Sequence, residues 1–123
     1  MIRIIGTRII IPKGDTGFFT IPKRGTFEEN DVAVFSVKDL LTKKTVIEKI
    51  VNITDLETDL LFELQHEDTS RLNVGSYNWD IKIYHKPEYD EDGILIDAKE
   101  INSYYSAFKP PLFIIKEVAK NNG

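Results

Sequence analysis

The 123-residue chain contains no cysteine, which excludes disulfide bonds, thiolate nucleophiles and cysteine-built zinc sites. Basic side chains are not in excess, since 16 Lys and Arg stand against 20 Asp and Glu, so nucleic acid is not an expected partner. The most apolar run, residues 1–11, is interrupted by Arg3 and Arg8 and is shorter than the roughly 20 residues of a membrane span. We therefore expect neither membrane insertion nor a secretion signal.

Helical periodicity is missing as well, because no window carries a sustained apolar stripe at a spacing of about 3.6 residues. Instead, short segments rich in Ile, Val, Phe and Tyr are separated by Gly, Pro, Asn and Asp. Hydrophobic residues make up 41% of the chain, which is enough for one core, and no repeat or linker is evident. The sequence predicts a single all-β domain over residues 1–123, with one helical turn each at 39–44 and 68–72.

The clearest predicted strand covers residues 76–84, where apolar and polar side chains alternate. Segment 60–64 alternates in the same way except that Leu61 breaks its polar face, whereas 32–38 is apolar on both faces and is expected to be covered on both. Segment 45–53 needs a bulge to reconcile its pattern, and further strands are expected at 2–11, 18–21, 94–101 and 112–118. The predicted core comprises Phe18, Phe35, Val37, Leu60, Phe62, Leu64, Tyr77, Trp79, Ile81, Ile83 and Ile114.

Candidate chemistry is sparse. Asp15-Thr16-Gly17 matches the catalytic tripeptide of dimeric aspartic proteases, but it follows Pro12-Lys13-Gly14 rather than an apolar strand, so a turn is the simpler interpretation. The acidic segment 88–92 lacks the spacing of a calcium loop and is interpreted as a solvated hairpin tip. His66 and His85 have no third metal ligand at a fixed spacing. No catalytic, metal-binding or cofactor-binding residue is predicted, and an enzyme is disfavoured.

Two aromatic positions stand out from the core pattern. Tyr104 and Tyr105 are candidates for an exposed platform that stacks on sugars, although packing under a loop or at an interface is the commoner use of such residues. A carbohydrate- or cell-surface-binding sandwich is therefore kept as an alternative function.

The segment 73–79 is the most informative stretch. In immunoglobulin-like sandwiches a tyrosine opens a strand two residues before a core position and its hydroxyl bonds back to the preceding corner. Tyr77 precedes Trp79 by two residues, Gly75 permits a tight turn and Leu72 can fill the corner. We expect these four residues to be structural, within an antiparallel immunoglobulin-like β-sandwich of about seven strands.

The chain also resembles small immunoglobulin-like proteins of phages and prophages, similar to the N-terminal domain of phage baseplate upper proteins. The resemblance rests on segments in the same order along the chain: 14–16, 31–38, 45–49, 67–72, 75–81 and 110–115. It implies a non-enzymatic virion structural or assembly module of the tail, baseplate or an appendage, assembled in the bacterial cytoplasm. Other virion proteins are the implied partners.

Edge strands favour the same kind of function. The unpaired N–H and C=O groups of an edge strand invite another strand, and the expected edges are segments 2–11 and 112–118. Self-association, or docking on a larger virion protein, is expected there. The alternative is that these two terminal segments pair with each other within one molecule.

Overall fold

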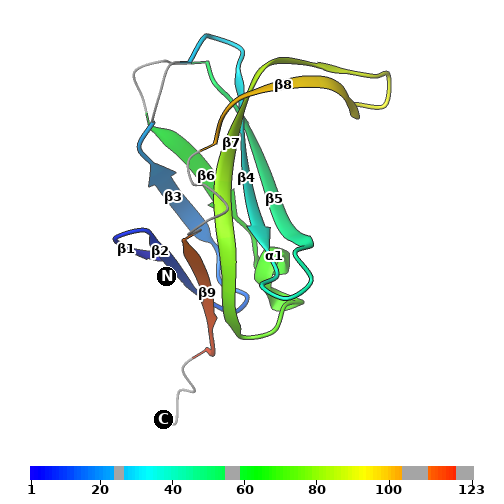
Figure 1. The fold of residues 1–123 in the computed structure, drawn as a ribbon. Coiled ribbons are helices and arrows are strands. Elements are labelled where there is room, and N and C mark those ends of the chain that lie inside the picture. Colours follow the sequence, from blue (N-terminus) through cyan, green and yellow to red (C-terminus); the bar gives the residue numbers. More distant parts are fainter. Residues whose placement is uncertain (24–26, 55–58, 104–110, 119–123) are drawn as a thin grey trace.

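The computed structural model describes residues 1–23, 27–54, 59–103 and 111–118, and within them it is an all-β sandwich (Figure 1). The predicted all-β sandwich is thus confirmed. The strands are β1 (Arg3–Ile5), β2 (Arg8–Pro12), β3 (Gly17–Ile21), β4 (Val32–Lys38), β5 (Thr45–Asn52), β6 (Leu60–Leu64), β7 (Gly75–Tyr89), β8 (Leu95–Ser103) and β9 (Leu112–Lys116), and the short helix α1 spans His66–Ser70.

Seven of these strands form one sheet, called the large sheet here, in the order β1-β2-β9-β7-β4-β5, with β8 paired to β7. The small sheet is the antiparallel pair β3-β6. All pairs of the large sheet are antiparallel except β2 and β9, which are parallel. The expected count of about seven strands is not confirmed, since the described residues contain nine, and the expected purely antiparallel pairing is wrong for the one parallel pair.

One additional strand arises near the N-terminus, where the expected single strand 2–11 is a hairpin. Gly6, at a φ of 61°, and Thr7 form its turn, with Ile5 opposite Arg8. A positive φ is readily adopted by glycine, so the apolar run bends back on itself there. The expected pair of open terminal edges is wrong, and the alternative is confirmed, because β2 pairs with β9 in the same molecule; of these terminal segments β1 alone stays at an edge of the sheet.

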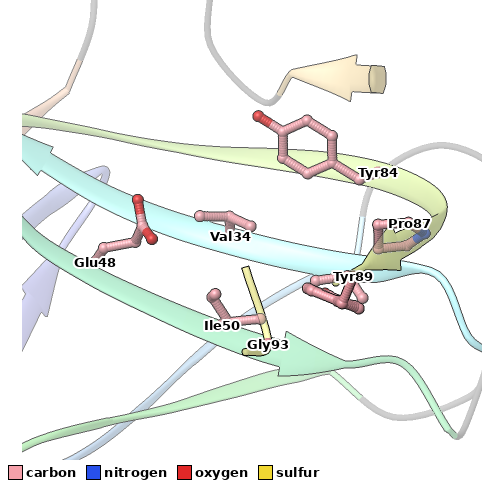
Figure 2. A pocket seen from close by; sticks show the side chains of 8 residues that line it. Val34, Glu48, Ile50, Tyr84, Pro87, Tyr89 and Gly93 are labelled. Carbon is pink, nitrogen blue, oxygen red and sulfur yellow. The ribbon is translucent and has the colours of Figure 1, made fainter. Parts of the chain in front are cut away.

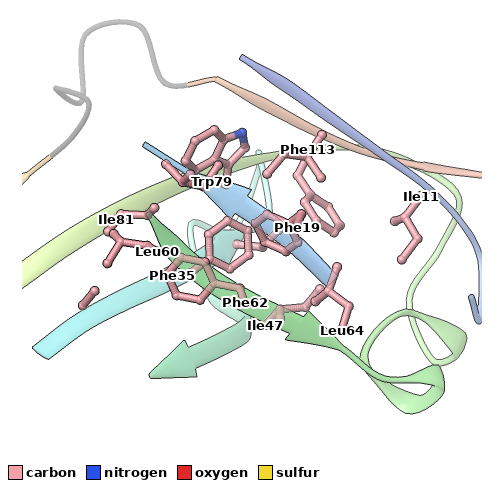
Figure 3. Packing of buried hydrophobic residues seen from close by; sticks show 14 of the residues in the cluster. Ile11, Phe19, Phe35, Ile47, Leu60, Phe62, Leu64, Trp79, Ile81 and Phe113 are labelled. Atoms are coloured by element: carbon pink, nitrogen blue, oxygen red, sulfur yellow. The ribbon is translucent and has the colours of Figure 1, made fainter. Parts of the chain in front are cut away.

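The core lies between the two sheets and is dominated by aromatic rings (Figure 3). Phe35 is central: its ring centroid lies 5.2 Å from that of Phe19, 5.4 Å from that of Phe62 and 5.6 Å from that of Trp79. Nine of the predicted core residues are buried as expected. They are Phe35, Val37, Leu60, Phe62, Leu64, Tyr77, Trp79, Ile81 and Ile83.

The prediction of a buried side chain is wrong for Phe18 and Ile114, and the strand register explains both cases. Phe19 pairs with Phe62 and points inward, so its neighbour Phe18, opposite Glu63, is 62% exposed. Ile114 is only partly buried, while Phe113 and Ile115 fill the core on the other face of β9. In each case two adjacent apolar residues left the inward face undetermined, because strand side chains alternate between faces.

Turns and bulges depart from the expected outline in small ways. Segment 39–44 forms a turn between strands and not the expected helical turn. The Asp39 carboxylate accepts hydrogen bonds from Leu41 N and Thr42 N, and Lys43 has a φ of 62°. The expected helical turn at 68–72 corresponds to α1, two residues earlier. The bulge expected in 45–53 lies at Val46, since Val37 pairs with Ile47 but Lys38 pairs with Thr45.

Candidate interaction surface

The outer edge of β5 has no strand paired to it among the described residues. On the inner side, Ile53 N donates to Asp31 O at 2.8 Å and Ile53 O accepts from Asn30 N at 2.9 Å, so the backbone of Ile53 faces β4. Because backbone groups alternate in direction along a strand, Glu48, Ile50 and Asn52 direct their N–H and C=O groups away from β4. The start of this edge is covered, since Arg71 Nη2 donates to Val46 O at 2.9 Å.

A groove of about 240 Å³ lies on the face of the large sheet opposite the core (Figure 2). The outer face of β4 and β5 forms its floor, and the bent end of β7 forms its wall. Its lining is mainly apolar and aromatic, and comprises Val32, Val34, Glu48, Ile50, Tyr84, Pro87, Tyr89 and Gly93. Ile50 is 54% exposed and Tyr89 is 44% exposed, so the groove presents apolar surface directly beside the open edge.

The bend in β7 is built from irregular backbone. Its register against β8 shifts between Ile83 and Tyr84 and again around Glu88, and Lys86 has a φ of 37°. Bulges bend a strand, and proline within a strand is tolerated at such positions, where Pro87 lies. The bend carries Pro87 and Tyr89 over the outer face, which is what closes one side of the groove.

A buried carboxylate fixes this bend. The Asp31 side chain is fully buried, and one oxygen accepts a bond from Glu28 N at 2.8 Å. The other oxygen contacts His85 Nδ1 at 2.9 Å and accepts a bond from Lys86 N at 3.3 Å. Since a buried carboxylate must be hydrogen-bonded to be tolerated, this network couples the start of β4 to the bulge of β7. Asp31 and His85 thus hold the bent end of β7, which forms the wall of the groove.

The rim of the groove is acidic. Glu48 lies on β5. The hairpin between β7 and β8, which contributes Gly93 to the groove, carries four exposed acidic residues: Glu88, Asp90, Glu91 and Asp92. Asp90 Oδ1 accepts bonds from Asp92 N and Ile94 N, both at 2.9 Å, which holds the tip as a turn. Lys82 lies on the same outer face, opposite Val34. The surface therefore combines an apolar floor with mostly negative charge.

The four residues expected to be structural lie at the turn into β7. The Tyr77 hydroxyl donates to Asn73 O at 2.7 Å, and burial, with Asp39 nearby, raises the pKa of Tyr77. Trp79 is buried and its Nε1 donates to Thr7 O at 3.0 Å, which ties β7 to the β1–β2 turn. Gly75 has a φ of 147°, and Leu72 packs partly buried against the core. None of the four contributes to the groove.

The remaining sequence candidates lie apart from this surface. The Asp15 carboxylate pairs with the N-terminal ammonium and accepts a bond from Thr16 N, and these contacts lower its pKa. His66 Nδ1 lies 2.6 Å from Gly14 O, where it ties α1 to the turn before β3. Tyr104 and Tyr105 lie outside the described residues.

Sequence reasoning missed the groove residues Ile50, Tyr84 and Tyr89. One signal was present: Val32 and Val34 made both faces of their strand apolar, which predicted a cover on the outer face. Val32 is indeed buried there. The cover itself, the bend of β7, depends on bulges that leave no regular pattern in the sequence.

No protein-family model, curated protein or solved structure matches this chain. Across the described residues, no helix has the length and apolar character needed to cross a lipid bilayer, and no group of three or more acidic or histidine side chains is arranged to hold a metal ion.

Proposed function

We propose that the protein is a non-enzymatic module of a phage or prophage particle that acts through protein–protein contacts. The observation that carries this proposal is the open edge of β5 beside an apolar groove. Exposed strand edges bind extended segments through backbone hydrogen bonds, and a neighbouring pocket selects their side chains. The virion setting rests on the resemblance of the sequence to small immunoglobulin-like phage proteins.

Several features support docking over catalysis. Among the described residues, the groove is lined mainly by apolar and aromatic side chains, with Glu48 as its one carboxylate. The fixed bend of β7 offers a rigid surface, which lowers the entropic cost of binding a partner.

The proposal is tested by particle composition. Phage particles released by prophage induction of the source strain are purified on a density gradient and analysed by quantitative mass spectrometry, with the gene neighbourhood read for tail, holin and endolysin genes. The chain is expected in the particle band at a fixed ratio to a tail protein. Its absence from that band, with the protein left in the soluble fraction, would contradict the proposal.

A matched variant links this result to the surface. Ile50→Lys places a charge in the groove and is expected to reduce incorporation, whereas Leu61→Lys, on the exposed face of β6, is expected to leave it unchanged. Glycan-array binding that is lost in Tyr84→Ala and Tyr89→Ala would favour a carbohydrate-binding sandwich instead. Peptidase activity that disappears in Asp15→Asn would favour the aspartic protease.

A further inference from the structure

The strand β1, at the other end of the large sheet's strand order, has a free edge that can be compared with the edge of β5. The large sheet ends at β1 on one side and at β5 on the other, and Figure 1 shows these strands on opposite sides of the molecule. In β1, Ile4 is 42% exposed and Ile5 is 51% exposed, and Arg3 adds a positive charge. Glu48 and Ile50, on the outer face of β5, are complementary in charge and polarity to Arg3 and Ile5 of β1.

The backbone of β1 is open in a compatible way. Ile5 and Arg8 flank the two-residue turn and form the closing pair of the hairpin. In such hairpins the flanking pair is hydrogen-bonded, so the backbone groups of Ile5 and Arg3 face β2. The N–H and C=O of Ile4 therefore point to the free side.

Chain direction and side-chain facing also agree. Four antiparallel steps and one parallel step separate β1 from β5, so the two strands run in the same direction within the large sheet. Arg3 and Ile5 share a face with Ile10 and Arg8, opposite to that of the core residue Ile9. Glu48 and Ile50 likewise lie on the outer face. A second copy placed in the same orientation therefore presents β1 to β5 in parallel, with outer faces aligned.

From this match we infer that the protein self-associates head to tail, with β1 of one copy added in parallel to β5 of the next. The inference rests on the proposed docking surface and names its occupant. In the matching register, Ile4 N of one copy donates to Glu48 O of the other, and Ile50 N donates to Ile4 O. Arg3 then lies opposite Glu48, and Ile5 lies opposite Ile50 beside the groove.

The length of the open edge fits this occupant. Arg71 covers the carbonyl of Val46, and β5 ends at Asn52, so the open stretch is short. The strand β1 has only three residues. A short strand pair buries much less than the roughly 1,000 Å² of a stable interface, so the association is expected to be weak and to depend on concentration.

The experiment measures the weight-average mass by sedimentation equilibrium from about 10 µM to about 1 mM, a range suited to a small interface. The parent protein is expected to grow beyond dimer as concentration rises. Arg3→Glu and Glu48→Arg are each expected to remain monomeric, because each places like charges opposite one another. A mixture of the two variants is expected to associate again, since the carboxylate introduced into β1 of one then faces the guanidinium introduced into β5 of the other.

Controls separate this contact from general effects. Glu63→Arg on β6 and Lys38→Glu at the end of β4 change charge equally at exposed positions and should associate like the parent. Ile4→Pro removes the donated bond while sparing the hairpin, because proline is tolerated on a strand edge, and it should abolish association.

A parent protein that stays monomeric at the highest concentration would overturn the inference. So would a mass that stops at the dimer and is insensitive to Arg3→Glu, which would indicate symmetric pairing of β5 with itself. The two proposals fail separately: a monomer that is still incorporated into particles leaves the proposed function standing, whereas association without incorporation removes the function alone.

Discussion

Trp79 joins three parts of the molecule, since it packs on Phe35, lies in β7 and donates a hydrogen bond to the β1–β2 turn at Thr7. Trp79→Ala removes a buried ring and leaves a cavity, so the free energy of unfolding should fall by about 3–5 kcal/mol. Urea denaturation followed by far-UV circular dichroism measures this loss. As the chain has one tryptophan, the parent's emission should be that of a buried indole; solvent-like emission would contradict the assignment.

Tyr77 gives a prediction at alkaline pH. Burial raises the pKa of its hydroxyl above the ordinary 10.0, with Asp39 adding to the effect and the bond to Asn73 O opposing it. Since the unfolded chain ionises first, the stability from this group is full below pH 10.0 and is lost as pH rises through the folded pKa. Thermal melts across this range should show the loss in the parent but not in Tyr77→Phe. The variant itself should cost about 0.5–1.5 kcal/mol near neutral pH.

Single residues also show where the sequence predicts correctly which side chains face the core. The alternating pattern assigned the inward face of β7 correctly, because a single polar side chain between apolar ones leaves one solution. Phe18 and Phe19 left two solutions, and only the pairing of Phe19 with Phe62 decides between them. Such pairings join segments distant in sequence, which local patterns do not report.

At the scale of elements, hydrogen exchange of the β5 amides tests which of them are paired with β4 and which lie on the free edge. Its inward amides, those of Ile47, Lys49 and Val51, should be protected from hydrogen exchange by β4. The outward amides of Glu48, Ile50 and Asn52 should exchange rapidly in dilute solution. Exchange measured by NMR at low and high concentration should show the Ile50 amide gaining protection on association. Uniform protection of all six amides in the monomer would show that the edge is covered.

The turn between β4 and β5 gives a prediction at acidic pH. Bonds from Thr42 N and Leu41 N lower the pKa of the Asp39 carboxylate from its ordinary 3.8. The stability it contributes is therefore present above pH 3.8 and is lost as pH falls through the folded pKa. Melting temperatures should decline less below this pH in Asp39→Asn than in the parent, with Asp59→Asn as an exposed control. Equal declines in parent and variant would contradict the assignment.

Elements also show how far the interaction surface could be foreseen. The strand positions of β5 and β7 follow from their composition, and the apolar outer face of β4 predicted a cover. The groove depends on where β7 bends, and the bend depends on Asp31 bonding to a histidine more than fifty residues away. The separate edge at β1 follows from the turn at Gly6, which the isoleucine-rich composition of residues 2–11 concealed.

For the whole molecule, one continuous core between the two sheets predicts one cooperative unfolding transition. Urea curves from tryptophan emission, which reports on Trp79, and from far-UV circular dichroism, which reports on all strands, should coincide. Two separated transitions would show that the β7–β8 hairpin or the small sheet unfolds by itself.

The parallel pairing of β2 with β9 has a consequence for how the protein is made. It joins residues 9–12 to residues 113–116, so a central ladder of the sheet closes across nearly the whole sequence. Contacts of such high order slow folding, which typically takes milliseconds to seconds for β-rich domains. During synthesis β2 and β7 must wait for β9 to leave the ribosome, with two unpaired edges facing each other. That interval, rather than the finished fold, is when the nascent chain is most exposed to misassembly.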